Sequence, residues 1–311
     1  MTVSARGDGP SVVAVGGGHG QAATLRAIRR YAAEVTAVVS VADDGGSSGR
    51  LRRQFGIVPP GDLRMCLVAL AEEGSPLARA FEHRFDSIDA TGDATRGLGS
   101  GSAPPGGAVG HALGNLVLAG LVWATGDLQA AIDEAGRLLG TVGHVVPAAA
   151  EPVVLKAESD AGWIEGQTAV RHTGRIRRVA LVPGDPPAPA RAVDALGQAD
   201  QVVLGPGSLY TSVLAAAMVP GITRAVADTT ARVVYVANLR PEAAETGGYD
   251  VAAHVTALLD HGVRVDMVVA DLAGIALGAV PVPVVERDLA RPNGLAHDPA
   301  RLAAVLRSLV G

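Results

Sequence analysis

Short hydrophobic runs alternate with longer segments of helical periodicity along most of this chain. The runs are rich in Val and Ala and lie at 11–15, 36–41, 201–204, 233–237 and 265–270. Because nearly every position in the later runs is apolar, rather than every second one, these strands are predicted to be buried on both faces. Strands that alternate with helices predict a Rossmann-like α/β fold, a mostly parallel sheet with helices on both faces.

The predicted helices occupy the segments between these strands. Their apolar residues recur every three or four positions, which is typical of one buried helix face. They are expected at 21–34, 63–72, 76–84, 113–125, 128–139 and 298–310. Asp298 followed by Pro299 is a good pair to begin the last of them.

Three segments depart from this alternation. Between 145 and 182, β-branched runs separated by turn residues predict a small antiparallel meander inserted into the α/β body. The stretch 91–110 consists mainly of Gly, Ser, Ala and Pro, which bury too little apolar surface to offset ordering entropy, so a flexible loop is expected. Residues 1–10 are predicted to be a flexible leader and 11–311 a single domain.

Composition narrows the classes of function. Hydrophobic residues make up 48% of the 311 and charged residues 18%, as in folded proteins. The net charge of −5 does not favour nucleic-acid binding, which depends on clustered positive side chains that neutralise phosphates. No run reaches the roughly 18 apolar residues of a membrane span, and no secretory signal opens the chain, so a cytoplasmic protein is expected. With Cys66 the single cysteine and Lys156 the single lysine, a disulfide framework, a thiolate metal cluster and a lysine-containing P-loop are excluded.

The first candidate site follows the strand at 11–15. That strand stops in a run of glycines and then flows into a helical pattern, so backbone N–H groups at a helix N-terminus would point into the turn. Residues without a Cβ let a phosphate come close to them. An anion cradle is therefore predicted at Gly17, Gly18, His19 and Gly20.

A second candidate site follows the strand at 36–41. Asp43 and Asp44 are each suited to accept from a ribose hydroxyl, to bind Mg²⁺ together with phosphates, or to form a turn. Adjacent residues of an extended chain point to opposite faces, so one of the two is expected to reach a ligand. The next residues offer amides, hydroxyls and a guanidinium that suit phosphate oxygens. They are Gly45, Gly46, Ser47, Ser48 and Arg50.

Two further segments carry candidate ligand-binding residues. Asp62 could accept from a hydroxyl, hold a metal or cap the helix at 63–72, and Arg64 could neutralise a phosphate. A second junction of strand, glycines and helix follows 201–204. A ligand could therefore lie across the carboxyl ends of the strands, with its phosphates bound by the helix N-termini of both junctions. The candidate residues of this junction are Gly205, Gly207, Ser208 and Tyr210. Tyr210 could stack on a base or pack in the core.

Asn115 and Asn238 lie beside apolar runs, where a buried amide must find partners. A base, a sugar edge or a backbone group would serve. His19 and His111 lie near glycine turns and could contact the ligand, but neither has a second histidine at metal-ligand spacing, so no zinc site is proposed. No cofactor follows from the residues alone, and Mg²⁺ held by Asp43, Asp44 or Asp62 remains an alternative.

The motifs together resemble the gluconeogenesis factor family of the YvcK type, which is related to the 2-phospho-L-lactate transferases of the CofD type. The matching segments recur in the family's order from about residue 11 to the C-terminus. They are Gly-Gly-Gly-His-Gly at 16–20, Val-Ala-Asp-Asp-Gly-Gly-Ser-Ser-Gly-Arg-Leu-Arg at 41–52, Pro-Pro-Gly-Asp-Leu-Arg at 59–64, Gly-Asn-Leu at 114–116, Gly-Pro-Gly-Ser-Leu-Tyr-Thr-Ser at 205–212 and Ala-Asn-Leu at 237–239. Two segments depart from the family: His19 replaces the usual Thr, and 240–246 replaces Met-Thr-Gln-Pro-Gly-Glu-Thr.

The resemblance implies a Rossmann-like regulatory protein that binds UDP-sugars such as UDP-N-acetylglucosamine. It also implies a link to cell shape and cell-wall metabolism during gluconeogenic growth, with cell-wall enzymes as candidate partners and no established reaction. The alternatives are a Mg²⁺-dependent CofD-like transferase of a nucleotide-activated phospho-substrate, and an NAD(P)-binding protein. The composition is compatible with a homodimer.

Overall fold

A seven-stranded parallel sheet forms the centre of the computed structural model, which describes residues 9–85, 108–160 and 162–311. Its strand order is β10-β9-β8-β7-β1-β2-β3, and every neighbouring pair is parallel. The strands are β1 (Ser11–Gly16), β2 (Glu34–Val39), β3 (His144–Pro147), β7 (Gln201–Leu204), β8 (Arg232–Val236), β9 (Met267–Ala270) and β10 (Val284–Glu286). The predicted Rossmann-like α/β class is confirmed.

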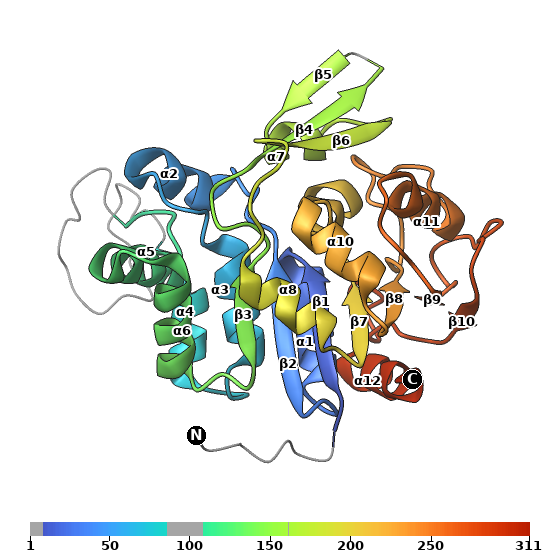
Figure 1. Cartoon of the computed structure of the whole chain (residues 1–311), viewed down its shortest axis with the longest axis horizontal. Helices are drawn as coiled ribbons and strands as arrows, with labels where there is room; N and C mark the ends of the chain where they lie inside the picture. The colour runs from blue at the N-terminus through green and yellow to red at the C-terminus, as the bar shows by residue number, and fades with distance from the viewer. Residues whose placement is uncertain (1–8, 86–107, 161) are drawn as a thin grey trace.

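Helices cover both faces of this sheet (Figure 1). They are α1 (Gly18–Ile28), α2 (Gly46–Phe55), α3 (Gly61–Leu70), α4 (Pro76–Glu82), α5 (Leu113–Thr125), α6 (Leu128–Leu139), α7 (Gln167–Arg171), α8 (Ala190–Gly197), α9 (Ala215–Ala217), α10 (Pro220–Asp228), α11 (Val251–Asp260) and α12 (Pro299–Ser308), with a π-helical segment η1 at Leu209–Leu214. Helices α8 and α10 pack together on one face, while α1 packs with α3 and α12 on the other.

The chain reverses its direction of travel across the sheet between β1 and β7. From β1 it moves outward to β2, and from β7 it moves outward the other way to β8. In open α/β sheets a ligand crevice lies outside the carboxyl ends of the strands at such a switch point. Both glycine-rich junctions predicted from sequence lie at these ends.

The core is built mainly from Val, Ala and Leu. The central strands are buried at almost every position, so their near-continuous hydrophobic runs have the predicted cause. Gln21 lies inside this core, where its Nε2 donates to the carbonyls of Ala14 and Val38, 3.0 Å each. The polar side chain of Gln21 is tolerated in the core because both hydrogens of its amide nitrogen are donated to backbone carbonyls.

The 145–182 segment differs from its prediction. β3 pairs in parallel with β2 and so belongs to the main sheet. The remaining strands, β4 (Val154–Ser159), β5 (Gly162–Glu165) and β6 (Arg178–Val182), form a separate antiparallel sheet of order β5-β4-β6. It is not a meander, because α7 carries the chain back so that β6 pairs with the other edge of β4. This small sheet stands beyond the carboxyl ends of the main strands in Figure 1.

Several helix boundaries also differ. The first helix begins at Gly18 and ends at Ile28, rather than spanning 21–34, because tight turns at 29–31 return the chain to β2. Helices α5 and α6 have the predicted bounds, and Asp298 caps α12 by accepting from the N–H groups of Ala300 and Arg301. The leader to residue 8 and most of the 91–110 stretch lie outside the described residues.

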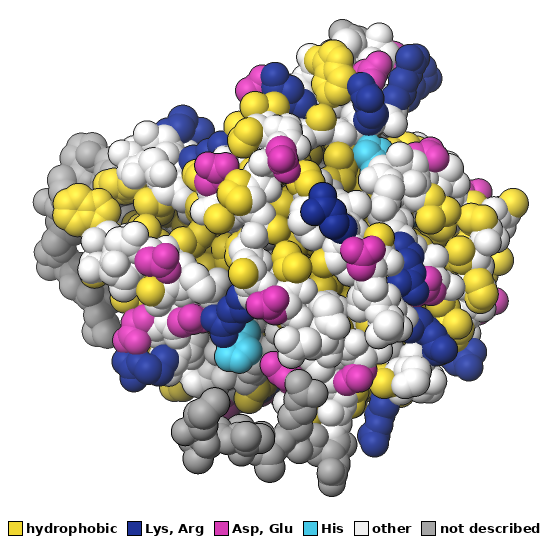
Figure 2. All heavy atoms as spheres, viewed as in Figure 1, with side chains coloured by type: hydrophobic (Ala, Val, Ile, Leu, Met, Phe, Trp, Pro, Cys, Tyr) yellow, Lys and Arg dark blue, Asp and Glu magenta, His cyan; other side chains and the backbone are white. Residues whose placement is uncertain are grey.

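Charged side chains of both signs are interspersed over the face seen in Figure 2. Within the ranges given above, no single helix combines the length and hydropathy of a membrane span. Segments Leu209–Ala217 and Pro220–Asp228 reach those values only as a pair, and they are bent by 75°.

Candidate functional site

Three helix N-termini meet at the carboxyl ends of β1 and β2. They belong to α1, α2 and α3, which begin at Gly18, Gly46 and Gly61. A Cβ on Gly61 would lie 2.4 Å from Ser48 Oγ and 2.9 Å from Asp43 Oδ2, so only glycine allows α3 to approach α2 this closely. The first amides of a helix have no carbonyl one turn earlier to accept from them. Donors are therefore concentrated at this edge of the sheet.

The glycine and serine segment after Asp44 forms the first turn of α2 rather than an irregular loop. Gly45 precedes the helix, and the N–H of Gly49 is the first to bond back to it, at 2.9 Å. The N–H groups of Gly46, Ser47 and Ser48 precede that first intrahelical bond. They form an anion-binding group, since the helix dipole adds to their partial charges.

Asp43 and Asp44 point in different directions, as the alternation of an extended chain predicts. Asp43 lines the cavity, and its Oδ1 accepts from the N–H of Gly45 at 2.9 Å. Asp44 Oδ1 accepts from both the N–H and the hydroxyl of Thr168, at 2.8 and 2.7 Å. Asp44 thus ties α7 to the body of the protein, and Asp43 alone of the two is placed to meet a ligand.

Asp62 lies buried beneath the first glycine loop. It does not cap α3, whose N-cap is Pro60 and carries no side-chain cap bond. Its carboxyl group accepts from the N–H of Gly18, and a Cβ on Gly17 would lie 2.4 Å from its Oδ2. Burial, together with the nearby negative charge of Asp43, raises the pKa of Asp62 to about 7.

A chain of hydrogen bonds links the polar side chains of α2, α3 and α5. Arg64 Nε donates to Asn115 Oδ1 at 3.0 Å, and Asn115 Nδ2 donates to Ser47 Oγ at 3.0 Å. Ser47 Oγ also lies 2.8 Å from His111 Nδ1, and Arg50 Nε donates to His111 Nε2 at 3.3 Å. The predicted need of Asn115 for partners is therefore met within the protein.

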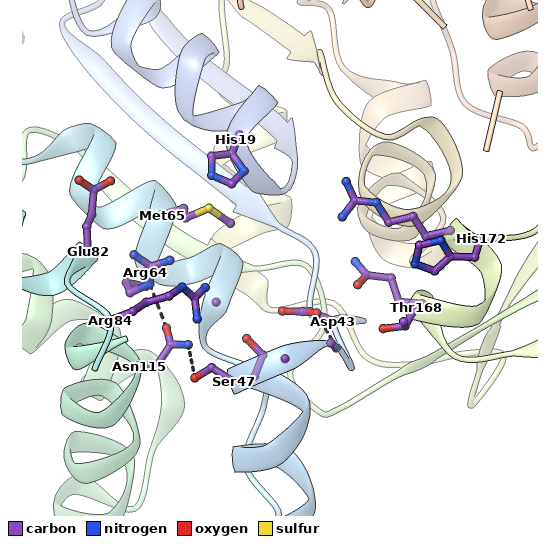
Figure 3. A pocket seen from close by; sticks show the side chains of 16 residues that line it. His19, Asp43, Ser47, Arg64, Met65, Glu82, Arg84, Asn115, Thr168 and His172 are labelled. Atoms are coloured by element: carbon purple, nitrogen blue, oxygen red, sulfur yellow. Dashed lines mark hydrogen bonds between the residues drawn. The ribbon is translucent and has the colours of Figure 1, made fainter. Parts of the chain in front are cut away.

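Ser47, Arg64 and Asn115 line a cavity of about 760 Å³, a size typical of ligand pockets, whereas His111 and Arg50 lie behind them and do not line it. Figure 3 shows Arg64, Arg84, Asn115 and Ser47 on one side and Thr168 and His172 on the other, with Asp43 between them. The lining residues that were predicted from sequence are His19, Asp43, Gly45, Gly46, Ser47, Ser48, Arg64 and Asn115.

The far wall of the cavity was missed by the sequence predictions. It comes from α7 and consists of Gln167, Thr168, Arg171 and His172. Met65, Glu82 and Arg84 on the near side were missed as well. The sequence offers only weak evidence for these far-wall residues: Arg171 and His172 are polar and lie just before a Thr-Gly turn, as binding residues often do. The same pattern is equally typical of a turn that only connects two strands.

The second junction lies against the first but does not line the cavity. A Cβ on Gly20 would lie 2.2 Å from Pro206 O, and Thr24 Oγ1 donates to Gly205 O at 2.7 Å. Several donors of this junction are already bonded within the protein. The N–H of Gly207 donates to Asn238 Oδ1 at 2.9 Å, and Asn238 Nδ2 donates back to Gly207 O at 3.0 Å.

Two carboxylates accept from three further donors of this junction. The N–H groups of Tyr210 and Thr211 both donate to Glu245 Oε1 at 2.8 Å, and the Ser208 hydroxyl donates to Glu242. The ring of Tyr210 is buried edge-on against Tyr249 and offers no face to a base. Ligand contacts of Gly205, Gly207, Ser208, Tyr210 and Asn238 would thus require these bonds to open.

Cys66 is fully buried on α3, where its Sγ donates to Gln21 Oε1 at 3.5 Å. Burial raises the pKa of its thiol, which keeps the reactive thiolate scarce. We expect native protein not to react with Ellman's reagent over an hour, whereas protein unfolded in guanidinium reacts with one equivalent. Rapid labelling of the native protein would contradict the buried placement of α3.

Sequence and structure comparisons place the chain among known proteins. The family model described as 2-phospho-L-lactate transferase CofD matches residues 12–289. A Mycobacterium tuberculosis relative is 44% identical over 95% of this chain and 89% of its own length. The gluconeogenesis factor of Bacillus subtilis is 39% identical over 82% of this chain and 76% of its own.

Among solved structures, a UPF0052 family member from Bacillus halodurans superposes with a TM-score of 0.85 at 33% identity, covering 96% of this chain and 99% of that one. The chain therefore belongs to the gluconeogenesis factor family, which is related to the CofD transferases.

Proposed function

We propose that this protein binds a nucleoside diphosphate sugar, of the UDP-sugar class, in the cavity between α2, α3 and α7. In this proposal it acts as a regulatory protein of cell-wall metabolism and cell shape in the cytoplasm of cells growing on gluconeogenic carbon sources. The observation that carries the binding proposal is the convergence of the α2 N-terminal amides with Arg64 and Arg84 on one cavity. Both groups favour negatively charged oxygens.

The arginines suit a diphosphate for a physical reason. Arg64 is only 6% exposed, and its guanidinium is held by Asn115 Oδ1 and by Phe81 O. Burial lowers its pKa, so bringing an anion against it would offset part of the cost of burying the charge. Arg84 and Arg171 add positive charge from two other elements. The acidic residues that line the cavity, Asp43 and Glu82, can accept from the hydroxyls of a sugar.

Arg64→Met is the direct test of this proposal. Methionine keeps an apolar stem of similar length, so packing is largely retained while the charged donor is lost. We expect the affinity for UDP-N-acetylglucosamine in isothermal titration to fall about 100-fold, as loss of hydrogen bonds to a charged group implies.

Arg53→Ala, on the exposed part of α2, is the matched control and should bind like the wild type. A ligand panel should include UDP, other UDP-sugars and NAD(P). Wild-type protein that binds no nucleotide sugar at millimolar concentration would rule out the proposed function.

A second candidate function is a Mg²⁺-dependent transferase of the CofD type. It is favoured by the proximity of Asp43 and Asp62, close enough for the charge of Asp43 to raise the pKa of Asp62. Among the described residues no group of three or more His, Cys, Asp or Glu could hold a metal. Mg²⁺ is commonly held by one or two carboxylates plus phosphate oxygens and water, so the pair fits a cation that arrives with a nucleotide. Mg²⁺-dependent turnover of a nucleotide-activated substrate, lost in Asp43→Asn, would establish this alternative.

A further inference from the structure

The hydroxyl of Ser47 is restricted in direction by its neighbours. On one side Asn115 is oriented by Arg64, whose Nε can only donate and does so to Asn115 Oδ1 at 3.0 Å. The amide nitrogen of Asn115 must then face Ser47, to whose Oγ it donates at 3.0 Å. One lone pair of the Ser47 oxygen is occupied.

On the other side His111 is oriented by Arg50. The Nε of Arg50 donates to His111 Nε2 at 3.3 Å, so Nε2 accepts and carries no proton. The proton of the neutral ring is then on Nδ1, which lies 2.8 Å from Ser47 Oγ and donates to it. Burial and the positive charges of Arg50 and Arg84 lower the pKa of His111, which keeps the ring neutral.

With both lone pairs occupied, the Ser47 hydroxyl can act only as a donor. Ser47 is 4% exposed and lines the cavity, where its labelled side chain lies beside Asn115 in Figure 3. We propose that Ser47 is a specificity-determining donor that selects an acceptor group of the ligand, which beside the α2 amides and Arg64 is a phosphate oxygen, and that His111 is its positioning residue. This inference rests on the proposed function, because it assigns one contact within the same cavity.

The hydrogen bonds of His111 to Ser47 and Arg50 also show that Ser47 and His111 are not a nucleophile and its general base. A serine within hydrogen-bond distance of a histidine is typical of such a pair, but the base must present an unprotonated nitrogen to the hydroxyl. Here the unprotonated nitrogen faces Arg50 instead. Ser47 is therefore not activated, and a ligand ammonium group at this position would leave two donors facing each other.

The direction of the bond can be measured without any ligand. In the ¹⁵N-histidine NMR spectrum of the wild-type protein, His111 is expected as the Nδ1–H tautomer. The spectrum of His111→Asn assigns its signals, and His83→Gln, at an exposed position on the same side of the protein, is the control that must leave them unchanged. A His111 signal of the Nε2–H tautomer would overturn the inference.

The contact with the ligand is measured by titration with UDP-N-acetylglucosamine. Ser47→Ala is expected to weaken binding about 10- to 100-fold, as for a hydrogen bond to a charged acceptor. Ser308→Ala, at an exposed position on α12, is the matched control. Unchanged affinity in Ser47→Ala would show that the donor does not meet the ligand and would overturn the inference.

The role of His111 is tested by two substitutions, His111→Asn and His111→Asp. The two new side chains have the same shape, but only asparagine can donate a hydrogen bond. Asparagine can still donate to Ser47, whereas aspartate would accept from it and turn the hydroxyl away from the cavity. His111→Asp should weaken binding at least tenfold more than His111→Asn. In a Ser47→Ala background the difference between the two should shrink, because the part that acts through Ser47 is gone. An undiminished difference would mean that the added charge acts on the ligand directly and would overturn the positioning role.

The two proposals can fail separately. Wild-type protein that binds no nucleotide sugar would refute the proposed function, whereas the tautomer of His111 would still be observed in the unliganded protein. Circular dichroism melts of each variant show whether it is folded.

Discussion

Gly20→Ala is expected to destabilise the protein by more than about 3 kcal/mol, since overpacking against a rigid backbone is among the most damaging single changes. A Cβ at this position would lie 2.2 Å from Pro206 O, 2.6 Å from Pro206 C and 2.8 Å from Gly207 Cα. All three are backbone atoms, so no side chain can rotate away. The junction after β7 is itself held by Asn238 and Glu245, and cannot easily retreat.

Urea unfolding followed by circular dichroism would measure this effect as a shift in the midpoint. Gly197→Ala is the matched control. Its added Cβ meets no heavy atom within 4 Å at the end of α8, so it should be neutral or stabilise by up to about 1 kcal/mol. Equal midpoints for Gly20→Ala and wild type would mean that the two junctions do not touch as described.

Asp62→Asn is expected to make the protein more stable above pH 7. The folded-state pKa of Asp62 is raised from 3.8 to about 7, so folding favours the protonated form. A group of this kind contributes stability that is present below its unfolded-state pKa and is lost as pH rises through its folded-state pKa. Between pH 3.8 and about pH 7 the free energy of unfolding of the wild type is therefore expected to fall by an amount on the order of 4 kcal/mol. Asparagine does not titrate, and its Oδ1 can still accept from the N–H of Gly18.

The measurement is the free energy of unfolding in urea at intervals between about pH 5 and pH 8. The wild-type curve should fall more steeply than that of Asp62→Asn. Glu245, whose pKa is also raised to about 7 by burial, contributes its own loss to both curves, so the comparison isolates Asp62. Asp185→Asn, at an exposed position, should follow the wild type. Parallel curves for wild type and Asp62→Asn would contradict the raised pKa of Asp62 and its burial beneath the glycine loop.

The parallel body of the fold was predictable because its signals are local. Runs of Val and Ala at 201–204 and 233–237 report strands buried on both faces, and the glycines at 16–20 report a close approach of backbone. The alternation rule also predicted that Asp43 and Asp44 point in different directions, as they do, although it did not say which of them faces the cavity.

The remainder depended on contacts between segments distant in sequence. His144–Pro147 could be assigned to the main sheet only by knowing that it pairs with β2. Arg171 lines the cavity on α7, and that helix is bonded through Thr168 to Asp44, which lies 124 positions before Thr168. The donors after β7 are bonded to Glu242 and Glu245, and no local pattern predicts that a distant carboxylate reaches those amides. Periodicity describes single elements, whereas these placements are properties of pairs.

The antiparallel sheet and α7 form an excursion of the chain between β3 and α8, anchored to the body by Asp44 and by Gln167, whose Nε2 donates to Thr211 O at 3.0 Å. The two sides of the cavity therefore come from different parts of the fold: the helix N-termini that suit phosphate belong to the main sheet and its helices, and the opposing polar groups belong to this inserted segment. Exchange of residues 150–182 between relatives would therefore change which sugar or nucleoside is preferred. Binding of the diphosphate by the helix N-termini would stay the same.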